Sequence, residues 1–453
     1  MEPLEKTRFF IIGHPRSGTT ALAELLNASD DIACLFYEGN ILYRLWRTLC
    51  RHNVLCEPHE DLVLDFKITA KHNLIDRAQE TGCKKITFSP SEVLSLVKGF
   101  REDLESTESP GDVYHDTADR FFRQLGCSAG AEVVGDKVPD YIIIPDILTS
   151  ALPRCRMLYV ERDPRATIHS VSQFTEKSLH LFAVPSAFAM AFSFLLKHEG
   201  MLDFMRHRPK HTLLSLSQAE LGGDPKAVGI KAAKFLGIPV CAKIAAHADK
   251  MIKYTHVKNW RKEMAEDDIA AVEAVCVESG FALPSESEAA PENNHWSEKA
   301  SKVCPLLDCT DDRISAILDD IRPVFKSTDD KRTLGLTLIQ FADYAHARGN
   351  FSRAHLYLDE AVQLIPDNPV LWFKLAELCF DMKLLDQSRS HYQRVETHSP
   401  KSTYFSLLKA KTFYQLGRIE RLAGSKKKAR DFFGRSLAVL PGFKLSMAML
   451  RIL

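Results

Sequence analysis

The segment comprising residues 8–20 constrains the fold of this chain more than any other. It opens with an apolar run of strand length, RFFIIG, which leads directly into a turn with glycine at both ends, Gly13 and Gly18. Over residues 19–27 the apolar side chains then follow a helical period. A buried strand that passes through a glycine turn into a helix is typical of a parallel sheet flanked by helices.

The same order of elements recurs further along the chain. Residues 157–160 form a second apolar run, followed by Pro164 and a helical pattern from Arg165, and residues 212–216 form a third run. Together these patterns predict an α/β fold with a P-loop-like parallel sheet flanked by helices. Sheets of this kind bind ligands beyond the carboxyl ends of their strands, where the two strand-to-helix turns lie.

The chain is long enough for more than one domain, because a single hydrophobic core rarely grows beyond about 250–300 residues and the sequence has 453. Residues 284–300 are polar and rich in Ser, Glu and Pro, as linkers are, and residues 311–321 have the pattern of a short helix. We therefore predict a first domain over residues 1–283, a linker with a short helix over 284–334, and a helical domain over 335–453.

Beyond residue 335 the sequence repeats itself every 34 residues. Ala342, Ala354, Ala361 and Pro366 of one unit correspond to Ala376, Ser388, Val395 and Pro400 of the next. A third unit, with Gly417, Ala429 and Pro441, is displaced by 41 residues, as a seven-residue insertion would cause. Small residues at fixed places let paired helices approach closely, and the prolines end each second helix. The pattern resembles the tetratricopeptide repeat, with an unrelated helical bundle as the alternative.

Composition and charge argue against several classes of protein. Lys and Arg number 59, and so do Asp and Glu, so that no overall field attracts nucleic acid or an anionic membrane. The eleven cysteines are scattered without a C-x-x-C pair, which disfavours a disulfide framework or a zinc site. The sequence has no continuous run of 18 apolar residues and no secretory signal pattern at its N-terminus. We expect a cytoplasmic protein without a transmembrane segment, a nucleic-acid partner or a metal.

The turn between the two glycines has the chemistry of a phosphate site. Its backbone N–H groups and the N-terminus of the following helix supply donors and partial positive charge, while Arg16 supplies a full charge. The hydroxyls of Thr19 and Thr20 can bind phosphate oxygens. The spacing nearly matches the Walker A loop, but Thr19 stands where that loop has its lysine. This departure disfavours an ATPase or phosphotransferase, which needs the lysine and a magnesium site.

The hexapeptide PRSGTT after an apolar strand resembles the 5′-phosphosulfate loop of sulfotransferases that use 3′-phosphoadenylyl sulfate (PAPS). Its arginine, in place of lysine, is similar to that of tyrosylprotein sulfotransferases and of many bacterial ones. The resemblance implies that the whole hexapeptide binds the phosphosulfate end of the nucleotide. Its members are Pro15, Arg16, Ser17, Gly18, Thr19 and Thr20.

A second motif follows the second apolar run. Arg162 stands at the predicted strand exit and Ser170 two helical turns later, so that both can bind one anion, the arginine with a pair of hydrogen bonds. This order resembles the 3′-phosphate motif of the same family. Lys253, Lys258 and Trp260 lie in a stretch similar to the loop that covers the nucleotide, where the lysines would bind the 3′-phosphate and the tryptophan would pack on the purine. A tryptophan at such a position serves at least as often as a core anchor.

Sulfuryl transfer needs a base for the acceptor and positive charge near the sulfonate. Arg16 is well placed to stabilise the transferred group, and Lys137, in a segment that resembles the family's G-[ED]-K-x-P sequence, is a second cation. Arginine-type relatives use a glutamate at the start of the element after the loop. That resemblance implies Glu38, 22 residues after Arg16, as the base. Asp136 and His115 are the alternatives.

We therefore predict an enzyme that moves a sulfuryl group from PAPS to a hydroxyl or amine of an acceptor and releases the bisphosphate PAP, without a metal. Two alternatives stay open: an inactive nucleotide-binding fold that acts with the repeats as a protein-binding scaffold, and a P-loop phosphotransferase. The acceptor can be a glycan, a protein, a lipid-like molecule or a small phenol. The repeats can bind a partner protein, mediate self-association or brace the catalytic domain.

Overall fold

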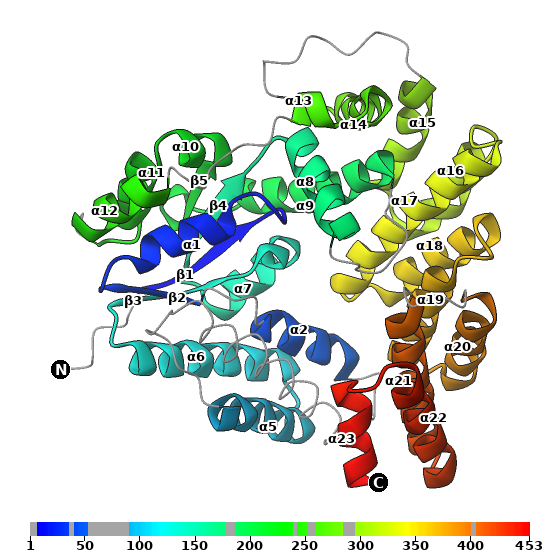
Figure 1. Cartoon of the computed structure of the whole chain (residues 1–453). Coiled ribbons are helices and arrows are strands. Elements are labelled where there is room, and N and C mark those ends of the chain that lie inside the picture. The colour runs from blue at the N-terminus through cyan, green and yellow to red at the C-terminus, as the bar shows by residue number, and fades with distance from the viewer. Residues whose placement is uncertain are drawn as a thin grey trace. The chain divides into compact units, whose positions relative to one another are not determined.

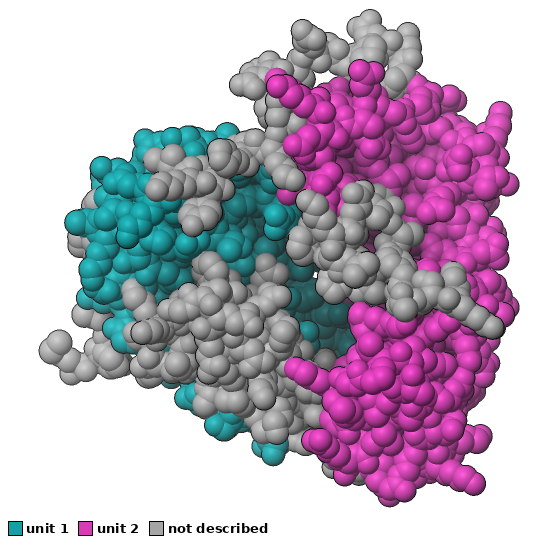
Figure 2. Space-filling model, in the orientation of Figure 1, with its two compact units in different colours: residues 1–53, 57–162, 199–258 teal, residues 54–56, 163–198, 259–453 magenta. Residues whose placement is uncertain are grey.

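The computed structural model describes most of the chain in separate stretches. They comprise residues 7–35, 40–52, 90–177, 186–238, 242–251, 260–283, 295–399 and 405–453. The chain divides into two compact units, which Figure 2 distinguishes by colour. The first unit consists of residues 1–53, 57–162 and 199–258, and the second of residues 54–56, 163–198 and 259–453.

The first unit contains a five-stranded sheet of order β2-β3-β1-β4-β5, in which every neighbouring pair is parallel (Figure 1). The strands are β1 (Thr7–Gly13), β2 (Ile32–Leu35), β3 (Val133–Lys137), β4 (Arg156–Glu161) and β5 (Leu213–Ser217). The predicted fold class is confirmed, and the three predicted apolar runs correspond to β1, β4 and β5. Strands β2 and β3 escape prediction because β2 has only four residues and β3 ends in a charged pair.

Helices cover both faces of this sheet (Figure 1). One face carries α1 (Thr19–Asn27), α10 (Gln218–Gly223), α11 (Pro225–Phe235) and α12 (Ala242–Met251). The other carries α6 (Pro110–Ala129), α7 (Pro145–Ala151) and the 3-10 turn η2 (Pro139–Ile143), with α2 (Ile41–His52) and α5 (Pro90–Ser106) packed on α6. The 3-10 turn η3 (Lys210–Thr212) precedes β5, and α9 (Ala187–Arg206) begins in the second unit and ends in the first.

Alternate side chains of the central strand β1 enter two different cores. Phe9 and Ile11 are fully buried in the core shared with α1, α11 and α12. Phe10 points to the other face, where its ring centroid lies 5.3 Å from that of Phe122 and 5.6 Å from that of Tyr141. Burying each such side chain contributes about 1.5–3 kcal/mol. Because β1 is covered on both faces, its sequence is a continuous apolar run rather than an alternating one.

The second unit is helical throughout the residues described. Its non-repeat helices are α8 (Pro164–Lys177), α13 (Trp260–Glu263), α14 (Glu266–Glu278), α15 (His295–Val303) and α16 (Ile314–Ile321), with the 3-10 turns η5 (Cys304–Leu306) and η6 (Asp311–Arg313). The predicted short helix thus appears as η6 followed by α16. The last residues of the predicted linker, 295–300, belong to α15, and residues 284–294 lie outside the described stretches.

The repeats form three helix pairs, as their spacing predicts. The pairs are α17 (Thr328–Ala347) with α18 (Phe351–Leu364), α19 (Pro369–Asp381) with α20 (Leu385–His398), and α21 (Ser406–Leu422) with α22 (Lys426–Val439), followed by α23 (Lys444–Ile452). The small residues at the repeated position, Ala354, Ser388 and Ala429, are all fully buried. The seven extra residues of the third unit lie in two places: the connection from α20 to α21 is three residues longer than that from α18 to α19. The helix α21, with 17 residues, is four longer than α19, with 13.

The repeats share one hydrophobic core with α8, α9, α14 and α15 of the same unit. The ring of Phe188 of α9 packs against that of Trp296 of α15 at a tilt, with 5.1 Å between their centroids. The ring centroid of Phe192 of α9 lies 5.7 Å from that of Phe341 of the first repeat helix. The inner part of the second unit is therefore a continuous core rather than a repeat array beside a separate helix cluster.

The end of β1 permits only glycine. A Cβ on Gly13 would lie 2.7 Å from the carbonyl oxygen of Val160 in β4 and 2.7 Å from Ser17 Oγ. Because the first of these is backbone, we expect Gly13→Ala to lower the free energy of unfolding by about 1–3 kcal/mol through overpacking. Gly111→Ala is the matched control, since nothing lies within 4 Å of its added methyl at the start of α6. Denaturant unfolding of both variants checks this, and equal stabilities would contradict it.

Candidate functional site

The first part of the candidate site is the loop between β1 and α1. It leaves the strand at Gly13 and turns sharply, with the backbone N–H of Ser17 donating to the carbonyl of His14 at 3.0 Å. Arg16 and Gly18 both have left-handed backbone conformations, with φ of 69° and 98°. For a non-glycine residue such as Arg16 this conformation is uncommon and occurs mainly in turns and at functional sites. Its side chain is exposed.

The hydroxyl of Ser17 lies inside this loop. Ser17 is fully buried, and its Oγ has no hydrogen-bond partner in the part of the chain that the structure describes. A buried hydroxyl without a partner costs about 1–3 kcal/mol. A phosphate or sulfate oxygen held by the loop would supply the missing acceptor. Of the remaining predicted loop residues, Pro15 and Gly18 are half-buried, Thr19 is buried and Thr20 is exposed.

The second strand exit lies beside this loop. β4 pairs with β1 so that Val160 stands opposite Gly13, and Arg162 follows two residues later. The Nη1 of Arg162 donates a hydrogen bond to the carbonyl oxygen of Arg16. The two predicted phosphate motifs thus begin at neighbouring strand ends, although 146 residues separate their arginines in the sequence.

On the other side of β1, the strand β3 ends at Lys137. Lys137 pairs with Ile11 in the sheet and is 2% exposed. The preceding residue, Asp136, accepts a hydrogen bond of 2.7 Å from the hydroxyl of Tyr141. Burial, followed by the charge of Asp136, raises the pKa of Tyr141 well above its usual value, so the phenol stays protonated and keeps donating. Asp136 is therefore engaged in the packing beside β3.

The carboxyl edge of the sheet therefore presents positive charge and hydrogen-bond donors that could bind an anion. Cationic side chains lie at the ends of three adjacent strands: Lys137 at β3, Arg16 after β1 and Arg162 after β4. The first N–H groups of α1 and its partial positive charge add donors at the loop. Such an edge suits an anion with several oxygens, such as a phosphate or a phosphosulfate.

Two further predicted residues belong to the second unit. Ser170 lies in α8 and is half-buried. Trp260 opens α13, and the guanidinium carbon of Arg165 lies 4.5 Å from the centre of its ring. This contact has the geometry of a cation–π interaction. One face of Trp260 is therefore used within the protein, and its contact with a purine stays a prediction.

Four predicted residues remain, of which only His115 lies within the described stretches. Glu38, Lys253 and Lys258 lie outside the described residues. The alternative base His115 lies half-buried on α6, with its ring centroid 6.3 Å from that of Tyr114.

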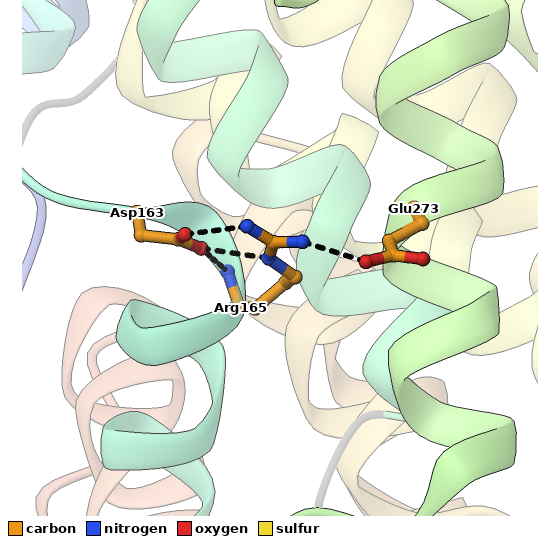
Figure 3. A network of polar contacts seen from close by, with 3 residues as sticks. All are labelled: Asp163, Arg165 and Glu273. Atoms are coloured by element: carbon orange, nitrogen blue, oxygen red, sulfur yellow. Dashed lines mark hydrogen bonds and ion pairs between the residues drawn. The ribbon is translucent and has the colours of Figure 1, made fainter. Parts of the chain in front are cut away.

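A buried ion network at the start of α8 was missed by sequence reasoning (Figure 3). Arg165 is 1% exposed and contacts the carboxylates of Asp163 and Glu273. Burial lowers the pKa of Arg165, but its hydrogen bonds to Asp163 and Glu273 outweigh this and leave the pKa above its usual value. The available signal is Glu273 itself, a lone carboxylate in the apolar run AAVEAVCV of α14.

Comparison with known proteins places this geometry in a family. Residues 8–242, more than half of the chain, match the sulfotransferase family. The chain therefore belongs to the sulfotransferase family and is a transferase by membership. Residues 345–412 match the tetratricopeptide repeat, which confirms the repeat type predicted from the spacing. No curated protein matches the chain.

Among solved structures, the chain is similar to two sulfotransferases and to a retinol dehydratase. The sulfotransferase domain from the curacin biosynthetic pathway is 15% identical and covers 62% of this chain and 99% of its own, with a TM-score of 0.38. Sulfotransferase STF9 from Mycobacterium avium is 15% identical and covers 63% of this chain and 79% of its own, with a TM-score of 0.38. Retinol dehydratase, solved with androsterone and the inactive cofactor PAP, is 16% identical and covers 72% and 83%, with a TM-score of 0.25.

None of the helices described is long and apolar enough to span a bilayer. Among the same residues, no group of three or more His, Cys, Asp and Glu side chains could hold a metal ion.

The unpaired hydroxyl of Ser17 makes a test that needs no ligand. We expect Ser17→Ala to leave the free energy of unfolding unchanged or to raise it, because the substitution removes a buried polar group without a partner. Ser388→Ala is the matched control, since that buried hydroxyl donates to the carbonyl of Ala376 at 2.8 Å. Its loss should lower the free energy of unfolding by about 0.5–1.5 kcal/mol. A larger loss for Ser17→Ala than for Ser388→Ala in denaturant unfolding would contradict this assignment.

Proposed function

We propose that this protein transfers a sulfuryl group from PAPS to a hydroxyl or amine of an acceptor and releases PAP. The observation that carries the proposal is the meeting of two motifs at neighbouring strand ends, where Arg162 donates to the backbone of the loop that contains Arg16. Membership of the sulfotransferase family supports the reaction class. The motif resemblance supports PAPS as the donor.

The donor set fits the two ends of this nucleotide. The loop residues Gly13–Gly18 and the start of α1 offer backbone N–H groups, the Ser17 hydroxyl and the charge of Arg16 to the 5′-phosphosulfate. Arg162 and Ser170 would bind the 3′-phosphate, the arginine through the paired donors of its guanidinium. Lys253 and Lys258 would add charge at the same phosphate, and Trp260 would lie near the purine.

The transfer then requires few groups. The acceptor oxygen or nitrogen forms a bond to sulfur while the bond between sulfur and the 5′-phosphate oxygen breaks, and PAP leaves with the bonding electrons. The carboxylate of Glu38 takes the proton of the acceptor. Arg16 and Lys137 stabilise the charge that develops on the sulfonate and on the leaving oxygen.

The proposal also includes the organisation of the chain into a catalytic domain over residues 1–283, a linker with a short helix over 284–334, and helical repeats over 335–453. It places the protein in the cytoplasm.

Thermal stability with PAP tests the donor site directly. A ligand that binds only the folded state raises the melting temperature, by an amount equivalent to about 2.7 kcal/mol at a hundred times its Kd. We expect PAP to stabilise the wild-type protein and to stabilise Arg16→Ala and Arg162→Ala much less. The control is Arg123→Ala: Arg123 pairs with Asp119, which also pairs with Arg8 at the opposite end of β1. This variant should retain the full effect of PAP.

The outcomes separate the alternatives. If PAP stabilises none of the proteins and magnesium ATP stabilises the wild type, a phosphotransferase is favoured and the proposal is wrong. If PAP binds tightly but no acceptor is modified in a broad screen with labelled PAPS, the inactive scaffold is favoured.

If Glu38 is the base, its loss should lower kcat without changing the affinity for PAP. With an acceptor found by that screen, Glu38→Gln should lower kcat by about 100-fold or more, which is the usual effect of removing a general base. The affinity for PAP should stay within about twofold, because the base contacts the acceptor rather than the nucleotide. The matched control Glu102→Gln changes an exposed glutamate of α5 and should leave kcat intact. An unchanged kcat in Glu38→Gln would assign the base to another residue.

A further inference from the structure

The first turn of α8 contains a buried arginine whose donors are distributed over two carboxylates (Figure 3). Its Nη2 donates to Asp163 Oδ2 at 2.7 Å and its Nε to Asp163 Oδ1 at 3.1 Å. Its Nη1 donates to Glu273 Oε1 at 2.6 Å. Glu273 belongs to α14, so this network ties the start of α8 to a helix that lies 108 residues away in the sequence.

Stability alone does not account for such a network. Arg165 and Glu273 are 1% and 8% exposed, and removing both charges from water costs several kcal/mol for each ion. Apolar side chains of similar volume usually stabilise a core as well or better. The charged pair instead restricts how α8 is oriented against α14. A guanidinium that makes three directed hydrogen bonds permits one geometry, whereas packed methyl groups permit several.

Asp163 has a second role in the same turn. Its Oδ1 also accepts the backbone N–H of Arg165 at 2.8 Å, as the N-cap residue of a helix does. The carboxylate that holds the guanidinium therefore also caps the backbone where α8 begins.

A second contact one turn further along keeps α8 from rotating. Nε2 of His169 lies 3.0 Å from Glu263 Oε2 of α13, and the ring of Trp260, one turn earlier in α13, covers the guanidinium of Arg165. Arg165 and His169 are both buried, as are all the residues from Pro164 to His169. Ser170 follows Arg165 by five residues, which places it about 140° around the helix axis from Arg165.

We propose that Arg165 is a positioning residue for the sulfuryl donor. By tying the first turn of α8 to α14 it fixes the rotation of α8, and with it the direction of the Ser170 hydroxyl. The inference rests on the proposed function, since it assumes that Ser170 binds the 3′-phosphate. Binding groups must be held within about 0.5 Å of the productive geometry, and a rotation of α8 by a few tens of degrees would move Ser170 further than that.

PAP affinity measured by calorimetry well below the melting temperature tests this role. We expect Arg165→Met to weaken PAP binding at least tenfold and to lower the melting temperature, because it leaves the Glu273 carboxylate buried and unpaired. The double variant Arg165→Met with Glu273→Met removes that unpaired charge. It should recover much of the melting temperature without recovering the affinity for PAP.

Val395→Ala is the stability control. Val395 is fully buried in α20 of the same unit and makes no part of the network. Its truncation should lower the melting temperature and leave the affinity for PAP within about twofold, because every hydrogen bond of the Arg165 network stays in place.

The possible results are distinguishable. If the double variant regains wild-type PAP affinity together with its stability, or if Val395→Ala weakens PAP as much as Arg165→Met at equal melting temperature, the network serves stability alone and the inference is wrong. If the wild-type protein itself binds no PAP, the proposed function fails and this inference fails with it. Tight PAP binding by the wild type together with an intact affinity in Arg165→Met would overturn the inference and leave the proposed function standing.

Discussion

The parallel pairing of β1 with β4 is the interaction on which the candidate site depends. It sets Gly13 opposite Val160 and so brings the two strand-to-helix turns to one edge of the sheet. Parallel strands are joined by long crossovers, and their carboxyl ends necessarily meet at the same edge. The pairing of β1 with β3 then adds Lys137 from the other side. The proposed anion site therefore depends on this order of three strands rather than on any single local motif.

The loop after β1 contains two features that are unfavourable for a folded chain without a ligand. Arg16 adopts a left-handed backbone, and the Ser17 hydroxyl is buried without a partner among the residues described. Neither feature helps the loop to fold, and both are found where a structure is arranged around a ligand. The neighbouring hydroxyl of Tyr141 is different, because it donates its hydrogen bond to Asp136 within the protein. This hydrogen bond ties the 3-10 turn η2 to the end of β3.

The helical repeats are part of the core that contains α8. Phe188 and Phe192 of α9 pack on Trp296 and Phe341, so the first repeat helix and the helices that follow β4 bury one another's apolar surface. The free energy of folding of the repeats and that of α8 are therefore coupled within the second unit.

The sequence by itself was enough for the fold class, the positions of β1, β4 and β5, and the three helix pairs of the repeats. Each of these depends on residues that are close in sequence: an apolar run followed by glycines, or small residues at a fixed period. The phosphate motifs of the proposal are read over equally short stretches. Strands β2 and β3 were not predicted from the sequence. β2 has only four residues, and β3 has five that end in a charged pair, so neither shows a clear strand pattern.

The tertiary structure alone decided which groups share an edge or a core. That Arg162 reaches the backbone of Arg16, and that Arg165 finds its carboxylate on α14, depends on chain segments more than a hundred residues apart. Local propensity contains no information about such pairs, because the partner is selected by the strand order and by helix packing. Sequence pattern thus determined the parts that can be read over a few turns of chain, while the topology of the sheet and the packing of α8 on α14 determined how those parts meet.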